Sequence, residues 1–338
     1  MNIVIMLFTQ KIDQKAQKRR ERYRIHSKLV RDISIFSKGW WLDATAGEEN
    51  WDVALITSDG EIIASMPYMI KKKLGFLKLT QPTLTPKLGP WIKKSNLKNV
   101  NQLKREKDLM NKLIDQLPRF SDFSQNWHYE YTNWLPFYWR DFTQTTKYSY
   151  LLPRNLDTKE IWKGLAESAR REIRKAKNRY SLIIRDDLSI KEFLKLNLKT
   201  FTSKGLKIPY SESFIYKLDS ICEKQKLRKI LIAEDSEGRR HAAVYIVWDE
   251  KYVYYLMGGA DPYLRKSGAF SFCMWEAICF SINSKKSFDF EGSMIEPVER
   301  FFRSFGAIQT PYFSITRTPS KLLSGYKFFQ SIFQVIKY

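Results

Sequence analysis

One pattern of apolar segments occurs twice in this chain of 338 residues, and it restricts the folds that the chain can adopt. Each copy reads as an apolar strand, a polar turn and a second apolar strand, which predicts a β-hairpin. A further strand, a helical stretch and another strand follow each hairpin. The copies comprise residues 52–70, 75–80, 103–117 and 127–131, and residues 229–247, 252–257, 269–282 and 287–291. A meander followed by a helix crossover builds a mixed sheet, so the repeat predicts an α/β (α+β mixed-sheet) fold made of two copies of one unit.

The repeat and the segments around it predict four parts of the chain. They are a basic N-terminal arm (1–34), a first α/β domain (35–145), a second α/β domain with the candidate active site (146–318) and an amphipathic C-terminal tail (319–338). The arm is expected to be either loosely ordered or a charged helix. Residues 158–178 read as one helix with an apolar stripe. Its second half presents basic side chains at Arg170, Arg171, Arg174 and Lys175.

The charge of the chain is strongly unbalanced. Lysine and arginine total 58 against 36 aspartates and glutamates, which gives a net charge of +22. Such a charge attracts polyanions over long range, and salt weakens the attraction. The candidate partners are RNA, an anionic membrane surface or a phosphorylated substrate. Hydrophobic residues make up 43% of the chain, which is enough to form real cores and excludes a disordered protein.

Cysteine and histidine are sparse and give no sign of a metal site or a covalent nucleophile. The three cysteines, Cys222, Cys273 and Cys279, form no CxxC pair, and the three histidines lack metal-ligand spacing. No Gly-x-Ser-x-Gly motif occurs either. No apolar run reaches about 18 residues, so we expect no transmembrane helix. These features predict a reduced, cytoplasmic protein without a tightly bound cofactor.

An acidic segment near the C-terminus is the main candidate site. In a strand over 288–291, Asp289 and Glu291 would point to the same side because side chains alternate. Arg300 and Arg303 follow, one helical turn apart. Carboxylates at a strand end close to basic side chains suit a transferase site. The same residues also fit an edge strand with solvated carboxylates beside an ordinary basic helix.

Three segments resemble the Fem (FemAB-like) group, whose members have two tandem GNAT-like acyltransferase domains. Residues 170–177 resemble its basic helix, 258–269 its loop before the central helix, and 288–293 with 302–306 its closing motif Phe-Lys-x-Phe-Gly. The Fem group comprises aminoacyl transferases that build peptidoglycan interpeptide bridges, together with related acyltransferases of cell-envelope polysaccharides. This chain departs from the pattern at Arg303, where the group has lysine, and at Lys93 and Lys94, near which the group tends to have an acidic residue.

The resemblance implies a direct acyl transfer to an amine, with no covalent enzyme intermediate. Asp289 or Glu291 would handle the amine and Arg303 the phosphate or developing oxyanion of the donor. Arg170, Arg171, Arg174, Lys175, Tyr254 and Arg300 are the expected substrate-binding residues. Arg265, Gly268 and Ala269 half-match the Gly-rich loop of acyl-CoA enzymes, which offers backbone N–H groups to a pyrophosphate. This loop equally fits an ordinary entry into a helix, and the basic face an ordinary solvated surface.

Two donors and two classes of function remain open from the sequence. Acyl-CoA would use the loop at 265–269, whereas an aminoacyl-tRNA would use the positive charge. The lysines at 93 and 94 favour acyl-CoA. The acceptor would be a glycan or peptidoglycan precursor, and the tail 319–338 could contact an anionic inner-membrane surface. The alternative of another class is a non-catalytic RNA- or membrane-binding protein on a degenerate GNAT fold.

Overall fold

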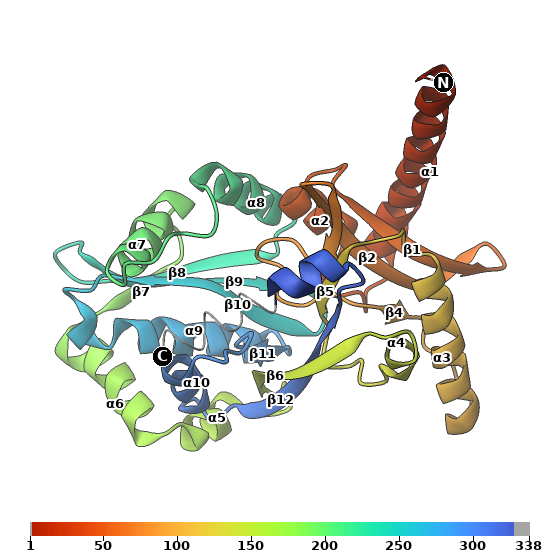
Figure 1. Ribbon diagram of the computed structural model, residues 1–338. Helices are drawn as coiled ribbons and strands as arrows, with labels where there is room; N and C mark the ends of the chain where they lie inside the picture. Colours follow the sequence, from red (N-terminus) through yellow and green to blue (C-terminus); the bar gives the residue numbers. More distant parts are fainter. Residues whose placement is uncertain (1, 328–338) are drawn as a thin grey trace. The chain divides into compact units, whose positions relative to one another are not determined.

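The computed structural model describes residues 2–327 and forms two compact units. Residues 2–147 and 312–327 belong to the first unit, and residues 148–311 form the second. The last strand of the chain therefore contributes mainly to the first unit, whereas the sequence analysis assigned 312–318 to the second domain. Figure 1 labels the helices and strands and colours the chain from red at the N-terminus to blue at the C-terminus.

The first unit is a sheet with its strands in the order β1-β2-β3-β5-β12, and β4 pairs with β2. Its strands are β1 (Trp51–Ser58), β2 (Glu61–Lys73), β3 (Phe76–Thr80), β4 (Trp91–Ile92), β5 (Asp122–Asn126) and β12 (Ile308–Arg317). Its helices are α1 (Asn2–Leu29), η1 (Ile35–Ser37), α2 (Gly39–Ala46), α3 (Asn99–Asp115) and α4 (Leu135–Tyr138). β3 and β5 are parallel, and the other pairs recorded in this unit are antiparallel. The predicted strand 127–131 is wrong: the strand is β5, and Trp127 only forms an isolated bridge with Leu88.

The basic N-terminal arm is a helix that packs on this unit. Tyr23 of α1 is fully buried and donates its hydroxyl to the backbone of Ser37 at 2.7 Å. Arg24 forms an ion pair with Asp43 at 2.7 Å, and Arg19 forms another with Asp52. Of the two expectations for the arm, the charged helix is therefore the one observed.

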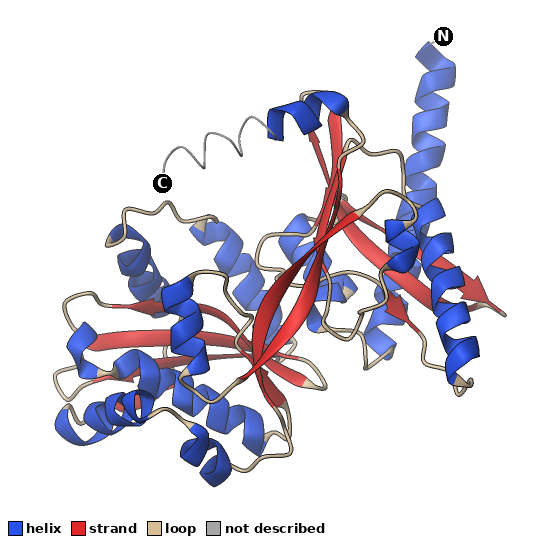
Figure 2. Cartoon of the chain, turned by 60° about the horizontal axis from the view of Figure 1, so that its bottom comes forward, coloured by secondary structure: helices blue, strands red, loops and turns tan. Residues whose placement is uncertain are grey.

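The second unit is a sheet in the order β6-β11-β10-β9-β8-β7, with helices on both of its faces (Figure 2). Its strands are β6 (Thr143–Leu152), which begins in the first unit, β7 (Ile183–Arg185), β8 (Arg228–Glu234), β9 (Arg240–Trp248), β10 (Tyr252–Ala260) and β11 (Ser287–Asp289). Its helices are α5 (Thr158–Gly164), α6 (Glu167–Arg174), the π-helix η2 (Lys175–Arg179), α7 (Ile190–Thr202), α8 (Glu212–Lys224), η3 (Arg265–Ser267), α9 (Ala269–Asn283) and α10 (Glu296–Arg303). β10 and β11 are parallel.

The core of the second unit forms around α9. This helix is apolar on nearly every side, and it buries residues such as Phe272, Met274 and Ile278 between the sheet and α6. The predicted helix 158–178 is broken at Leu165 into α5 and α6. Its predicted stripe, which includes Leu165, Ala169 and Ile173, is nevertheless buried in this core.

The two units have the same order of elements, as the repeat predicted. β1, β2, β3, α3 and β5 of the first unit correspond to β8, β9, β10, α9 and β11 of the second. Each unit is followed by a strand that pairs with the sheet of the other unit. β6 follows β5 in the chain but pairs with β11, and β12 follows β11 but pairs with β5. Each sheet is thus completed by a strand from the other half of the chain.

The C-terminal tail is described only in part. Residues 321–327 are helical, and Leu323 is buried in the first unit. Lys327 donates to Asp122 at 2.5 Å. The expected membrane contact of the tail falls mostly on residues outside the described part.

Candidate active site

The two central strands of the second unit pair only briefly and then diverge. The parallel register joins residues 252–254 of β10 to residues 287–289 of β11. β10 continues to Ala260, whereas β11 ends at Asp289. A β-bulge near Leu256 interrupts the pairing of β10 with β9, and bulges bend a strand and are frequent beside functional sites. The divergence opens the edge of β10 at the point where the chain leads into the loop before α9.

The loop before α9 is packed against α6. Gly268 has a φ of 77°, and a Cβ placed on it would lie 2.2 Å from the Glu172 carbonyl oxygen. Glycine is needed at this position because of its backbone conformation and because α6 approaches closely. Ala269 is buried, while Arg265 and Lys266 are exposed. The loop predicted for the donor and the helix predicted for the substrate are thus brought together.

The basic helix pairs most of its cations with its own acids. Arg170 and Arg174 contact Glu167 at 3.0 and 3.3 Å, and Lys175 contacts Glu172 at 2.5 Å. Arg171 is exposed and has no ion pair among the described residues. The positive surface beside the loop is therefore formed mainly by Arg171, Arg265 and Lys266, a smaller set than the sequence predicted.

Aromatic rings gather beside the diverging part of β10. The Tyr255 ring lies 6.3 Å from that of Phe270 and 6.0 Å from that of Phe302. A Cβ on Gly258 would lie 2.4 Å from the Tyr255 hydroxyl. Tyr254, expected to bind substrate, is instead fully buried, and its hydroxyl donates to Asp249 at 2.8 Å. The β-strand alternation explains this placement, since neighbouring tyrosines of one strand face opposite sides.

The acidic tip, residues 288–291, is only partly the strand that the sequence predicted. β11 ends at Asp289, so Glu291 does not follow it on the same strand face. Asp289 is fully buried; it accepts a hydrogen bond from the Ser149 hydroxyl at 2.5 Å and another from the Glu291 backbone N–H at 2.8 Å. Glu291 has a φ of 63° and is half-buried. Asp289 has no exposed surface with which to touch a substrate, so its contacts shape the turn that carries Glu291.

Gly292 completes this turn under a tight steric constraint. Its φ is 69°, and a Cβ on it would lie 2.0 Å from the Tyr148 carbonyl oxygen of β6. The backbone can pass this close to β6 only without a side chain. The turn therefore depends on the exchanged strand as well as on its own sequence.

Arg303 is held by a carboxylate that the sequence analysis missed. Its Nε donates to Glu299 Oε1 at 3.0 Å, so its ion pair is with Glu299 and not with Glu291. The same Glu299 oxygen accepts a hydrogen bond from the Tyr150 hydroxyl at 2.8 Å, and Gln309 donates to that hydroxyl at 2.8 Å. The Tyr150 hydrogen bond lowers the pKa of Glu299. The spacing of four residues between Glu299 and Arg303 was the signal in the sequence that could have found this pair.

The acidic tip packs against α10 and the residues that follow it. The Phe290 ring is 5.2 Å from the Phe302 ring and 5.6 Å from the Phe305 ring. Arg300 instead pairs with Glu296 at 2.8 Å on an exposed surface. The packing of Phe290 on α10 brings the turn at Glu291 close to the helix that carries Arg303.

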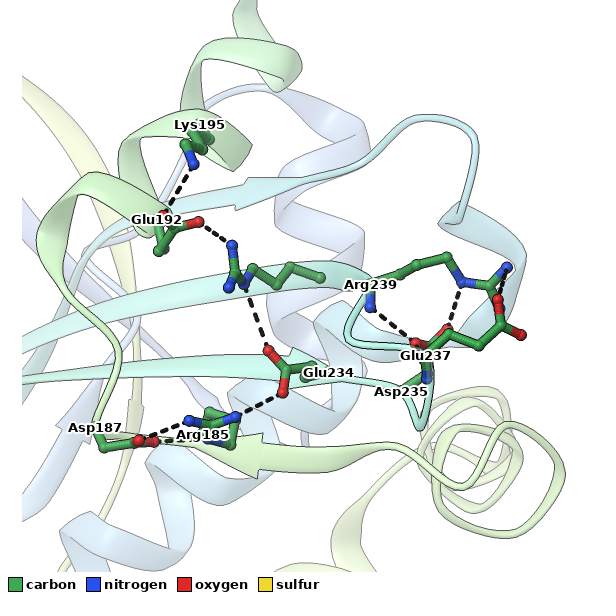
Figure 3. A network of polar contacts seen from close by, with 9 residues as sticks. Arg185, Asp187, Glu192, Lys195, Glu234, Asp235, Glu237 and Arg239 are labelled. Carbon is green, nitrogen blue, oxygen red and sulfur yellow. Dashed lines mark hydrogen bonds and ion pairs between the residues drawn. The ribbon is translucent and has the colours of Figure 1, made fainter.

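A second group of charged residues lies at the other end of the sheet and balances its own charges (Figure 3). Arg185 bridges Glu234 and Asp187 at 2.7 Å each, and Arg239 contacts Asp235 at 2.7 Å. The Arg185 guanidinium lowers the pKa of Asp187 to about 2. Each of these cations has a nearby carboxylate, so this network stabilises the edge of the sheet and is a poor site for an anionic ligand.

The structure gives no sign of metal or thiol chemistry in its described part. No group of three or more potential metal ligands occurs within residues 14–327, the part of the chain whose side chains are described. Burial raises the pKa of Cys222, Cys273 and Cys279 to about 12, which leaves little thiolate at neutral pH. No helix in the same range has the length and apolar character needed to cross a bilayer.

One known protein family matches a region within the second unit. A family model described as an acetyltransferase (GNAT) domain matches residues 164–294, from α6 through β10 and the loop to the acidic tip. The second unit thus matches the GNAT family of acyltransferases over most of its length. The match supports an acyltransferase. The GNAT-like topology of both units confirms the predicted tandem fold.

Solved structures of similar fold cover most of the chain. FemX has a TM-score of 0.63 at 10% identity, over 87% of this chain and 95% of FemX. A domain from Agrobacterium fabrum, described as the C-terminal domain of a lysylphosphatidylglycerol synthetase, has a TM-score of 0.52 at 11% identity, over 88% of this chain and 91% of that domain. A search of curated proteins found no match. At these identities the likeness concerns the fold alone, and it agrees with the FemAB-like arrangement expected from the sequence.

Proposed function

We propose that this GNAT protein transfers an acyl group directly from acyl-CoA to an amine of a cell-envelope glycan or peptidoglycan precursor. The observation that carries the proposal is the divergence of β10 and β11 beside the loop at 265–268. An extended thioester donor can lie along a strand edge that has no neighbouring strand, with its phosphates near Arg265 and Lys266. The backbone groups of β10 past Tyr254 are the natural partners for the amides of such a donor.

The residues around the acidic tip would then handle the acceptor. An amine must lose a proton before it attacks, and Glu291 is the half-buried carboxylate at the end of the diverging strand. Asp289 would keep the turn in shape. Arg303, held through Nε by Glu299, would direct its remaining N–H groups at a phosphate or at the developing oxyanion. Tyr150 would orient Glu299 and thereby Arg303.

The transfer would proceed without an acyl-enzyme. The three cysteines are poor nucleophiles because burial holds their pKa near 12. Alignment of the two substrates would then supply most of the rate enhancement, because a direct transfer gains mainly from proximity.

The test is a transfer assay with purified full-length protein, acetyl-CoA and a panel of amino-sugar and muropeptide acceptors, read by mass spectrometry. Arg303→Ala and Glu291→Gln should each lower kcat/KM at least about tenfold, and Arg303→Lys should recover part of the loss because charge is kept. Arg140→Ala is the matched control, since Arg140 also forms an exposed ion pair, with Asp115 at 2.9 Å. Full activity in both Arg303→Ala and Glu291→Gln, with the fold intact, would exclude these roles.

A second candidate donor is an aminoacyl-tRNA. Two observations favour it: α6, which carries the exposed Arg171, packs against the loop that carries Arg265 and Lys266, and the fold is similar to that of FemX. A tRNA acceptor stem would contact Arg171, Arg265 and Lys266 mainly through phosphates. Transfer from charged tRNA, with none from acetyl-CoA, would select this donor. An Arg171→Ala/Lys266→Ala variant should then bind tRNA more weakly and with a smaller salt dependence.

A further inference from the structure

The connection between β2 and β3 forms a basic hairpin that extends past the edge of β1. The last residue of β2 paired with β1 is Met69, and β2 continues to Lys73 paired with β3 alone. We call residues 71–78 the basic hairpin tip. This tip belongs to the first unit and has no part in the acyl-transfer site proposed above.

The charge of the tip is of one sign. Lys71, Lys72 and Lys73 are exposed, and none of them has an ion pair among the described residues. Lys78 lies directly opposite Lys71 in the register and forms a long ion pair with Asp122 at 3.7 Å. Like charges directly opposite each other weaken a strand pair. No aspartate or glutamate occurs from residue 62 to residue 105, so the hairpin's own sequence supplies no counter-charge to Lys71, Lys72 and Lys73.

The turn at the end of the tip is apolar and strained. Leu74 and Gly75 have φ values of 49° and 76°, which makes a two-residue turn with both residues in the left-handed region. Asparagine or glycine is the usual choice at the first of these positions, because a bulky side chain is strained there. Leu74 is also 86% exposed. A leucine that is both strained and exposed lowers the stability of the folded state, and within the described structure little burial of its side chain compensates for the strain.

The hairpin thus contains two features that lower its stability: the lysines that face each other, and a leucine that is both strained and exposed. Such departures concentrate at functional positions. Anionic headgroups would neutralise the lysines, and the Leu74 side chain would enter the acyl boundary of a bilayer. A nucleic acid would also neutralise the lysines, but it offers Leu74 no apolar medium.

We propose that the basic hairpin tip docks this protein on an anionic membrane surface, with Leu74 inserted between phosphate-bearing headgroups. Phe76 and Leu77 follow the turn half-buried and add apolar surface at its base. The docking does not depend on the identity of the acyl donor or acceptor, and it uses a segment distinct from the C-terminal tail.

The proposal is tested by co-sedimentation of the full-length protein with vesicles of phosphatidylcholine, with or without phosphatidylglycerol, in the absence of any donor or acceptor. We expect binding that requires phosphatidylglycerol and falls with salt. A Lys72→Gln/Lys73→Gln variant should bind about 25-fold more weakly, at roughly fivefold per lysine. Leu74→Asn should also weaken binding while leaving the fold intact, because asparagine tolerates the left-handed turn.

The matched control is Lys104→Gln/Lys112→Gln, which removes the same charge from exposed positions of α3. Its binding should fall by less than that of the hairpin variant. Equal losses in the two variants would mean that only net charge matters and would overturn the proposal. The same holds if the hairpin variants change the retention of tRNA on a filter but leave vesicle binding unchanged, because the partner would then be a nucleic acid. A loss of acyl transfer without a change in vesicle binding would count against the proposed function alone.

Discussion

Replacing Gly268 by alanine should destabilise the second unit, and the reason is packing between the loop and α6. The new Cβ would lie 2.2 Å from the Glu172 carbonyl oxygen and 2.9 Å from its carbon, and both are backbone atoms that cannot rotate away. The left-handed φ of 77° adds a strain of about 1 to 2 kcal/mol. Forcing the loop and α6 apart should add about 1 to 3 kcal/mol. The expected loss is therefore about 2 to 5 kcal/mol.

Gly238 offers a control with the same backbone strain and no clash. Its φ is 76°, it also lies in the second unit, and nothing lies within 4 Å of a Cβ built on it. Gly238→Ala should thus cost only the left-handed strain of about 1 to 2 kcal/mol. The difference between the two variants isolates the contact with Glu172.

The assay is urea unfolding of both variants beside the natural sequence, with hydrogen exchange of peptides from α6 and α9 to assign the loss to the second unit. With a slope of about 2 kcal/mol per molar urea, the midpoint of Gly268→Ala should lie roughly 0.5 to 1.5 M below that of Gly238→Ala. Equal midpoints would refute the reasoning. A Gly268→Ala variant that is as stable as Gly238→Ala but has lost donor affinity would instead show that the glycine serves the approach of the donor's phosphates.

Three further outcomes follow from the contacts of the site. Asp289→Ala should lower the melting temperature through a loss of about 1 to 3 kcal/mol, because it removes the one oxygen, Oδ1, that accepts from both the Ser149 hydroxyl and the Glu291 backbone N–H; an unchanged melting temperature would contradict this. The pKa of Glu299 is lowered, so its stabilisation is present above its ordinary pKa of 4.5 and is lost as the pH falls through the folded value. The gap in melting temperature between the natural protein and Tyr150→Phe should therefore narrow as the pH falls from about 6 to about 3, and a constant gap would count against the contact. Burial raises the pKa of Cys273 to about 12, so a thiol reagent at neutral pH should label this cysteine only when the protein unfolds. Mass spectrometry would follow the labelling, and fast labelling of the folded protein would show that Cys273 is not protected.

The candidate site illustrates where reasoning from the sequence stops. Residues 288–291 were predicted as a strand from their alternating pattern, but the strand ends at Asp289. The turn that follows is fixed by Ser149 and by the Tyr148 carbonyl, and both lie about 140 residues earlier in the chain. No pattern within the segment itself contains that information. The pairing of Arg303 with Glu299 was visible as helical spacing, yet its anchoring by Tyr150 was not.

The exchanged strands show the same limit at the level of the fold. Periods of two and of about 3.6 residues are local properties, and they were enough to find the repeated hairpin, strand, helix and strand. Which edge a strand joins depends on contacts between distant parts of the chain. The order along the chain would put β6 beside β5, whereas β6 pairs with β11 and β12 with β5.

By itself, the sequence determined the class of fold, its duplication and the buried stripe of the basic helix, because each of these follows from the spacing of apolar residues along the chain. Only the tertiary structure decided that Asp289 is buried, that Gly268 is a packing position and that Glu299 holds Arg303. Burial and partnership are set by what the folded chain brings against a residue, and here that neighbour is often a strand or helix from a distant part of the sequence.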